Sequence, residues 1–221
     1  TELGKSITHL RHNGIKLKVH AATNNNKAIG AVYNAAIHER WTQHIIVFMH
    51  DDVRINDRYI AHHLHEALKT YDVVGVVGNR RRYFGQPAWH RPRFLSQAGP
   101  THDLMGSICH DTTHTPNSKR SVHGLSRFGE CPGTAQLLDG VFLAVRGRTL
   151  LTHDVRFDAD LGFHFYDLDF CRSATQAHLR LGVWPIALTH MSVGGYESKG
   201  WSIAYKKYLD KWGEQAPLKF A

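Results

Sequence analysis

The feature that most constrains this chain is an apolar run, Ile45–Met49, that passes through His50 into two adjacent carboxylates, Asp51 and Asp52. An apolar run without polar alternation predicts a strand that is covered on both faces, as in a mostly parallel sheet. Ligands bind at the carboxyl edge of such a sheet, where two acids either repel each other or share a cation. The stretch therefore predicts a divalent-metal site, with a turn that caps the next helix as the alternative.

Length and composition predict one α/β domain over residues 1–221. The chain is 42% hydrophobic, enough for a full core. It has no apolar run of transmembrane length, and its start lacks a signal-peptide pattern. Its three cysteines favour reduced thiols over a disulfide framework. We therefore expect a cytoplasmic protein.

The formal charge of +8 favours an anionic partner: nucleic acid, a phosphorylated small molecule or an acidic membrane surface. No basic helix with interleaved aromatic residues is found, which argues against nucleic acid. Residues 201–212 predict an amphipathic helix with lysines on one side. This helix either packs on its own core or makes a peripheral membrane contact.

Predicted strands and helices alternate along most of the chain, which is typical of a parallel sheet flanked by helices. Strands are predicted at 15–20, 45–49, 71–77, 136–145 and 183–189, and helices at 27–40, 57–69, about 166–179 and 201–212. Between them, residues 79–132 are rich in Gly, Pro, Ser, Thr and His. This segment predicts a long irregular excursion of the kind that carries function.

An acid pair after a buried strand, an aromatic-flanked acid at a helix start and a histidine after a late strand follow one another in order. Together they resemble a GT-A glycosyltransferase, more narrowly the branch of glycosyltransferase family 2 that includes the streptomycin-biosynthesis-type domain. The segments that carry this resemblance are His50–Val53, Asn79–Arg82, Leu138–Phe142, Phe163–Arg172 and Trp184–His190.

The resemblance implies a Rossmann-like α/β fold with a mostly parallel central sheet flanked by helices. It also implies metal-dependent, inverting transfer of a sugar from a nucleotide-diphosphate donor to a hydroxyl of a glycan, a lipid-linked glycan or a similar acceptor, as in polysaccharide biosynthesis. Relatives begin with a central apolar strand and a loop that holds the base. Here residues 1–6 look like the helix after it, so we expect the first strand to be absent.

The same resemblance assigns the metal ligands. Asp52 would bind Mn²⁺ or Mg²⁺, Asp51 would lie near the donor ribose or the metal, and His190 would join the metal or contact the diphosphate. A divalent ion suits this role because it stabilises the charge that develops on the leaving diphosphate. His190 is one of 18 histidines, so an ordinary structural role is the alternative.

The family pattern places the general base at Asp167, which would take the proton from the acceptor hydroxyl as its oxygen attacks the anomeric carbon. The alternative is that Asp167 only caps the helix that begins beside it. Asp169 is interpreted as a first-turn acid that complements the helix dipole.

Further donor contacts are implied at Asn25 and Asn34, which would line the nucleotide, and at Asp139 and Gly140, beside the donor sugar and acceptor. Capping in an Asn-rich turn explains Asn25 equally well. The run Arg80–Arg82 could bind phosphate, or could be a solvated loop. A zinc site would draw on Cys109, His110, His114, His123 and Cys131, but their spacing fits no standard signature.

Two other functions remain open from the sequence. A nucleotidyltransferase or phosphohydrolase also needs a metal and arginines, but the chain has no phosphate-cradling glycine loop. A non-catalytic carbohydrate-binding domain could use a set of aromatic residues as a sugar platform, namely Trp89, Phe163, Tyr166 and Trp201. The presence of Asp52, Asp167 and His190 together argues against a non-catalytic domain.

Overall fold

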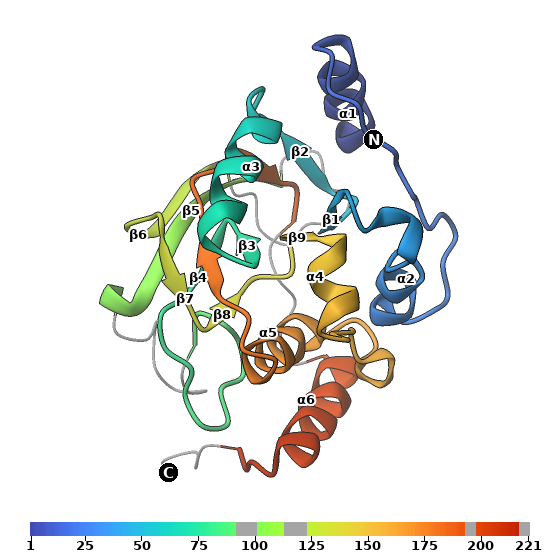
Figure 1. The fold of residues 1–221 in the computed structure, drawn as a ribbon. Helices are drawn as coiled ribbons and strands as arrows, with labels where there is room; N and C mark the ends of the chain where they lie inside the picture. Colours follow the sequence, from blue (N-terminus) through green and yellow to red (C-terminus); the bar gives the residue numbers. More distant parts are fainter. Residues whose placement is uncertain (92–100, 113–122, 193–197, 217–221) are drawn as a thin grey trace.

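The computed structural model describes residues 1–91, 101–112, 123–192 and 198–216 (Figure 1). The helices are α1 (Glu2–His12), α2 (Ile29–Ala35), α3 (Ile60–Thr70), α4 (Gly147–Thr152), α5 (Tyr166–Gln176) and α6 (Lys199–Trp212). The strands are β1 (Ile45–Met49), β2 (Val53–Ile55), β3 (Val73–Gly75), β4 (Val77–Asn79), β5 (Leu104–Asp111), β6 (His123–Gly129), β7 (Gly133–Ala135), β8 (Leu137–Leu138), β9 (Phe142–Arg146), β10 (Leu181–Val183) and β11 (Leu188–His190). Short 3-10 turns lie at η1 (Glu39–Trp41), η2 (Thr101–Asp103) and η3 (Ala159–Leu161).

The described strands form two mixed sheets. The first has the order β1-β9-β3-β10-β7, and the second has the order β2-β11-β5-β4-β8, with β6 pairing with β5 in addition. Within them β3 and β10 are parallel, as are β11 and β5, and the other pairs are antiparallel. The expectation of a mostly parallel sheet is therefore wrong, because an apolar run does not record the direction of the neighbouring strand. The run Ile45–Met49 is also not covered on both faces: it forms the edge strand β1, pairs antiparallel with β9, and is only partly buried except at Phe48. The mixed α/β arrangement is consistent with a GT-A-like fold.

Among the described residues the chain passes from one sheet to the other six times across a break of only one to four residues. Val76 alone separates β3 from β4, so the predicted strand 71–77 is divided between the two sheets. The predicted strands 136–145 and 183–189 are divided in the same way, into β8 with β9 and β10 with β11. His50–Asp52 is the break between β1 and β2, and Asp139–Val141 is the break between β8 and β9. The two breaks are joined because the His50 N–H donates to the Val141 carbonyl at 3.2 Å.

The N-terminal part departs from the sequence prediction. Residues 15–20 form no strand, and the predicted helix 27–40 is reduced to α2 and η1. Helix α1 lies at the rim of the molecule beside β2, where the Ile55 N–H donates to the Ser6 hydroxyl at 3.2 Å (Figure 1). In the described residues the first sheet runs without interruption from β1 to β7, so the expectation of a missing first strand gains no support.

The segment predicted to be irregular contains regular structure. Strands β5 and β6 pair antiparallel across it, with a register shift between Gly106 and Ser107. Glycine, histidine and cysteine interrupt the alternation of apolar residues in β5, so the sequence pattern did not predict this strand. Residues 92–100 and 113–122 of the same segment lie outside the described residues.

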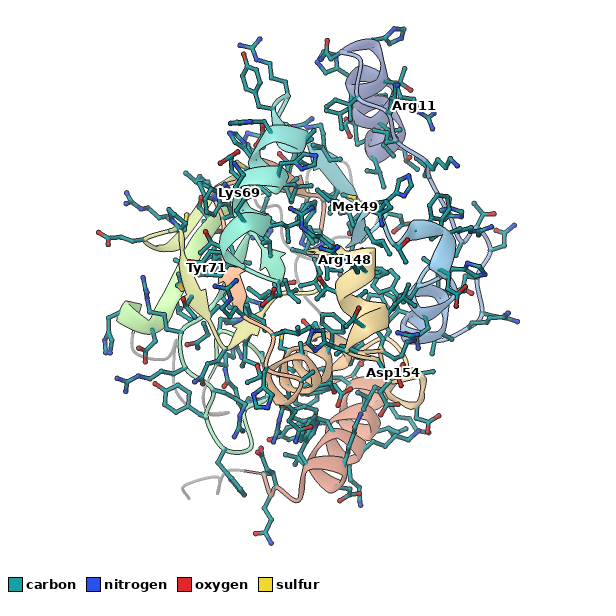
Figure 2. All side chains as sticks on the ribbon, in the orientation of Figure 1. Arg11, Met49, Lys69, Tyr71, Arg148 and Asp154 are labelled. Atoms are coloured by element: carbon teal, nitrogen blue, oxygen red, sulfur yellow. The ribbon has the colours of Figure 1, made fainter. Side chains whose placement is uncertain are left out.

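Helix α6 lies beside α5 (Figure 1), and the side that it turns to the core is aromatic. Trp201, Tyr205 and Tyr208 are buried, and the Phe165 ring stacks on those of Tyr205 and Tyr208 at 5.1 and 5.3 Å. The amphipathic helix predicted over 201–212 is thus confirmed, and its apolar side packs on the protein's own core. Charged side chains such as Arg11 and Asp154 project outward (Figure 2). Among the described helices, none combines the length and apolar character that a bilayer span requires.

Candidate active site

The break after β1 and the end of β11 bring three potential metal ligands together. The Asp52 carboxylate lies 3.3 Å from His190 Nε2 and 3.9 Å from His50 Nδ1. One donor atom from each of the three residues falls within 4.8 Å of the others. The Met191 N–H also donates to the Asp52 carbonyl at 2.8 Å, which holds the two chain segments in register. This cluster can hold a cation between one carboxylate and two imidazoles.

The surroundings keep Asp52 ionised and His50 neutral. Burial alone would raise the pKa of Asp52, but the hydrogen bond and charge of His190, with contributions from Ser192 and His50, lower it to about 2. Burial lowers the pKa of His50. An anionic carboxylate beside a neutral imidazole is the protonation state in which both groups can bind a metal.

Further side chains orient the two imidazoles. His50 Nε2 lies 2.7 Å from the Tyr166 hydroxyl, and the exposed ring of Phe163 stacks on that of His50 at 5.8 Å. When His50 donates from Nε2 to the Tyr166 oxygen, Nδ1 presents its lone pair toward Asp52. On the other side of the cluster, His190 Nε2 lies 3.1 Å from the Ser192 hydroxyl.

Asp167 stands at the start of α5, next to an unusual backbone conformation. Phe165 has φ 63°, in the left-handed region that a non-glycine residue seldom adopts, and it turns the chain into the helix. The Asp167 carboxylate accepts hydrogen bonds from the Gly140 N–H at 3.0 Å and from the Leu168 N–H at 2.9 Å. Protein surrounds the carboxylate closely although the residue keeps some exposed area, and burial together with the charge of Asp139 raises its pKa to about 7.

Asp139 and Gly140 form the turn that faces Asp167. Asp139 accepts hydrogen bonds from the Trp89 indole and from the Val141 N–H at 2.8 Å. Gly140 is required because a Cβ at this position would overlap the Tyr166 ring and hydroxyl. The site therefore contains a carboxyl group with a near-neutral pKa beside a potential metal cluster, an arrangement suited to general base chemistry.

Comparison with known families identifies the chain. Residues 5–216 match the model of a family described as a glycosyltransferase-like family, which is nearly the whole sequence. The protein belongs to this glycosyltransferase family. In a search of curated protein sequences no significant match was found.

Family membership makes the protein a glycosyltransferase and confirms the broad resemblance to family 2. It favours sugar transfer over the nucleotidyltransferase and phosphohydrolase alternatives and over a non-catalytic domain. The match does not distinguish the streptomycin-biosynthesis-type branch from others.

The glycosyltransferase brings together most of the residues that the sequence singled out. Asp52 and His190 share the potential metal cluster, while Gly140 and Asp167 share a hydrogen bond and Asp139 lies beside them. Asp51 is exposed next to the cluster. Asp169, predicted as a first-turn acid, is in the first turn of α5 but is buried and binds Lys211 and Trp212 of α6.

Two predicted nucleotide contacts are engaged elsewhere in the protein. Among the described residues, the exposed Asn25 bonds within its own turn, to the backbone N–H and carbonyl of Lys27. Asn34 bonds to the backbone N–H and carbonyl of Phe157, at 2.9 and 2.7 Å, and so ties α2 to the segment before η3.

The arginine run and the histidine-cysteine segment also have other roles. Arg82 pairs with Glu214 at 2.7 Å and Arg81 lies 3.5 Å from Asp103, so these two guanidinium groups face protein carboxylates. Cys109 and Cys131 are free thiols, and in the part of the chain that the structure describes the metal-capable group is His50, Asp52 and His190. His114 lies outside the described residues.

Sequence reasoning did not assign His50 to the metal site, and it offered Tyr166 and Trp89 only as sugar-platform aromatics and His110 only as a possible zinc ligand. His50 and Tyr166 each precede a predicted acid directly, and that adjacency was an available signal. His110 lies near His190, with ring centroids 5.9 Å apart. No local pattern places His110 or Trp89 beside this cluster, because both lie in the segment predicted to be irregular and reach the site only through tertiary structure.

Proposed function

We propose that this glycosyltransferase is a metal-dependent, inverting enzyme that moves a sugar from a nucleotide-diphosphate donor to a hydroxyl of a glycan, free or lipid-linked. The observation that carries the proposal is the His50–Asp52–His190 cluster, which is connected to Asp167 through the hydrogen bond between His50 and Tyr166 and the adjacent start of α5. The cluster would bind the donor, and Asp167 would act on the acceptor.

The donor set favours Mn²⁺ over Mg²⁺. Imidazole nitrogen suits a first-row transition ion, whereas Mg²⁺ prefers oxygen ligands and retains several waters. His50, Asp52 and His190 supply two nitrogens and one oxygen, from the break after β1 and from the end of β11. When bound, such an ion would stabilise the negative charge of the departing nucleoside diphosphate.

Asp167 is proposed as the general base. The acceptor hydroxyl oxygen attacks the anomeric carbon, its proton passes to the Asp167 carboxylate, and the bond from the anomeric carbon to the diphosphate oxygen breaks. One such displacement inverts the configuration at that carbon. A carboxyl group with a pKa of about 7 is a stronger base than an ordinary aspartate, because burial and Asp139 oppose its ionisation.

The remaining donor contacts are proposed for Asp51, Asp139 and Gly140, which border the cluster and the base. Asn25 and Asn34 belong to the same proposal, but a direct contact with the nucleotide would require each to release a backbone hydrogen bond. We also propose a cytoplasmic enzyme. A peripheral membrane contact would use the exposed Lys206 and Lys207 of α6, because the aromatic face of that helix is already buried.

Calorimetric titration with nucleotide-sugars tests the proposal. Binding of a donor should strengthen when Mn²⁺ is present, and Asp52→Ala should remove this metal-dependent part. His65→Ala, which removes an exposed histidine from α3, is the matched control and should leave it intact. Equal donor affinity in the presence and absence of Mn²⁺, for the wild type and Asp52→Ala alike, would contradict the metal-dependent mechanism.

A further inference from the structure

Trp89 connects a distant loop to the acid pair of the proposed active site. Its indole N–H donates to Asp139 Oδ2 at 2.5 Å, while Asp139 Oδ1 accepts from the Val141 N–H. Asp139 forms no ion pair with the other described residues, so neutral donors alone hold its carboxylate. The orientation of Asp139 therefore depends on where the loop places the indole.

The indole position is determined by packing and by bonds to its own backbone. Trp89 is 6% exposed, and its ring meets the edge of Phe128 at 5.0 Å. Its carbonyl accepts hydrogen bonds from the Asn79 side chain at 2.9 Å and from the fully buried Gln86 side chain at 2.8 Å. Because Trp89 is held at both its ring and its backbone carbonyl, the indole has little freedom to turn away from Asp139.

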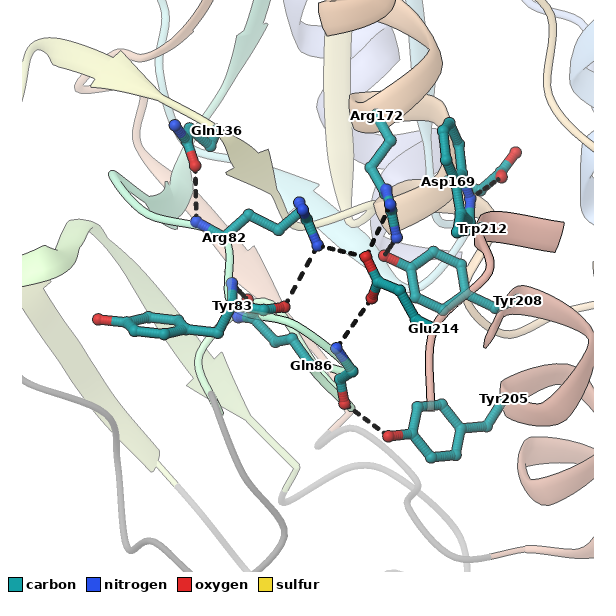
Figure 3. A network of polar contacts seen from close by, with 11 residues as sticks. Arg82, Tyr83, Gln86, Gln136, Asp169, Arg172, Tyr205, Tyr208, Trp212 and Glu214 are labelled. Carbon is teal, nitrogen blue, oxygen red and sulfur yellow. Dashed lines mark hydrogen bonds and ion pairs between the residues drawn. The ribbon is translucent and has the colours of Figure 1, made fainter. Parts of the chain in front are cut away.

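The loop that carries Trp89 is itself attached to α6 and to Glu214 just after it (Figure 3). Glu214 accepts from the Gly85 N–H at 2.8 Å and pairs with Arg82 and Arg172 at 2.7 and 2.8 Å. The Tyr205 hydroxyl donates to the Gly85 carbonyl. These contacts set the loop from residue 82 to residue 89 against α6.

The turn that Trp89 restrains also holds Asp167. Gly140, next to Asp139, donates its N–H to Asp167, so one short segment positions both carboxylates. A shift of Asp139 would move a negative charge and a hydrogen-bond donor relative to Asp167 at once. Displacements of about 1 Å at a reacting group can lower the rate roughly a hundredfold.

We propose that Trp89 is a positioning residue that holds Asp139 against Asp167 through its indole N–H. This role rests on the proposed function, in which Asp167 takes the acceptor proton. It requires no contact between Trp89 and the substrate. The ring packs in the core, and the N–H group alone acts on the acid pair.

Trp89→Phe tests the proposal because it keeps an aromatic ring against Phe128 and removes the donated hydrogen bond together with the five-membered part of the indole ring. We expect kcat to fall roughly tenfold to a hundredfold with the donor KM changed less than about threefold. Trp212→Phe is the matched control, since it removes an indole bond to another carboxylate, Asp169, and should leave kcat near the wild-type value. The double variant Trp89→Phe/Asp139→Asn should lose no more kcat than Asp139→Asn alone, because both changes break one interaction.

A spectroscopic measurement checks the hydrogen bond without relying on activity. In a ¹H–¹⁵N spectrum, the Trp89 indole N–H, identified by its loss in Trp89→Phe, should move upfield in Asp139→Asn and stay in place in Asp160→Asn. If the indole resonance does not move in Asp139→Asn, or if Trp89→Phe keeps the wild-type kcat, the positioning role of Trp89 is overturned while the proposed function still stands. Absence of sugar transfer and of metal-linked donor binding in the wild-type protein would overturn the proposed function as a whole.

Discussion

Asp167 illustrates how folding changes the chemistry of a single residue. Backbone N–H groups of Gly140 and Leu168 bind its carboxylate and by themselves favour the ionised form. Burial and the charge of Asp139 act in the opposite direction and prevail, so the pKa rises from 3.8 to about 7. The residue can thus accept a proton near neutral pH and remain only partly protonated.

The pH dependence of transfer follows from this shift. A base must be deprotonated to act, so kcat/KM should rise about tenfold per pH unit below pH ~7 and level off above it. Asp167→Asn should abolish transfer at every pH and leave donor binding intact, as measured by calorimetry. Asp160→Asn, an exposed acid of η3, is the control. Normal turnover by Asp167→Asn would show that another group is the base.

The same shift predicts how stability changes with pH. Between pH ~4 and ~7 the folded protein keeps the Asp167 proton that the unfolded chain has released, so the free energy of unfolding should fall as pH rises through this range. Asp167→Asn should flatten this part of the profile. Urea denaturation at a series of pH values measures both, and an unchanged slope in the variant would contradict the raised pKa.

Gly140 provides a second test at the scale of one residue. A Cβ at this position would overlap the Tyr166 hydroxyl, which also bonds to His50. Gly140→Ala should therefore destabilise the protein by roughly 1–3 kcal/mol and lower transfer strongly. In Gly200→Ala, at the start of α6, the nearest atom lies 3.9 Å away, so thermal unfolding should show no loss. Equal stability of the two variants would contradict the overlap.

At the scale of elements, α6 is attached to the rest of the protein by buried polar contacts as well as aromatic packing. Glu214, just beyond the helix, pairs with Arg172 of α5 and with Arg82 of the loop before Trp89 (Figure 3). Lys211 and Trp212 bind Asp169 at 2.9 and 2.8 Å. The helix thus joins α5, which carries Asp167, to the loop that carries Trp89.

Replacing Glu214 should loosen this attachment. Glu214→Gln leaves two arginines without their carboxylate in a largely buried position and should lower the free energy of unfolding by about 3 kcal/mol. Asp210→Asn breaks an exposed pair with Lys206 on the same helix and should cost less than about 0.5 kcal/mol. Chemical denaturation of both variants gives the comparison. A Glu214→Gln loss as small as that of Asp210→Asn would show that the network adds little stability.

At the scale of the whole molecule, the proposed metal cluster draws on both sheets. His50 and Asp52 lie between β1 of the first sheet and β2 of the second, while His190 ends β11 of the second. A ligand that binds all three is expected to bind the folded chain only. A ligand that binds the folded state and not the unfolded chain raises the free energy of unfolding. The increase is about 2.7 kcal/mol when the free ligand concentration is a hundred times its Kd.

Thermal unfolding with added Mn²⁺ measures this coupling. The Tm of the wild type should rise with Mn²⁺ concentration, and the rise should be absent in His190→Ala and in Asp52→Ala. His62→Ala, an exposed histidine of α3, should retain it. A rise of equal size in all four proteins would place the metal elsewhere.

Much of the candidate site could be predicted from the sequence because its residues lie in short local patterns. The apolar run Ile45–Met49 does form a strand, and it leads directly to Asp52. Asp167 does begin a helix, and the aromatic face predicted over 201–212 is buried. These features follow from side-chain period and from neighbours in the chain, which a sequence records directly.

Tertiary structure alone decided how the strands pair and which distant groups meet. The break at Val76 and the antiparallel neighbours of β9 could not be predicted, because strand direction and partner are set by contacts far apart in the chain. For the same reason no local pattern pointed from Trp89 to Asp139, or from His50 to Tyr166. The sequence by itself determined the family and the acids, whereas packing between segments determined the pKa of Asp167 and the three-residue cluster that we propose binds the metal.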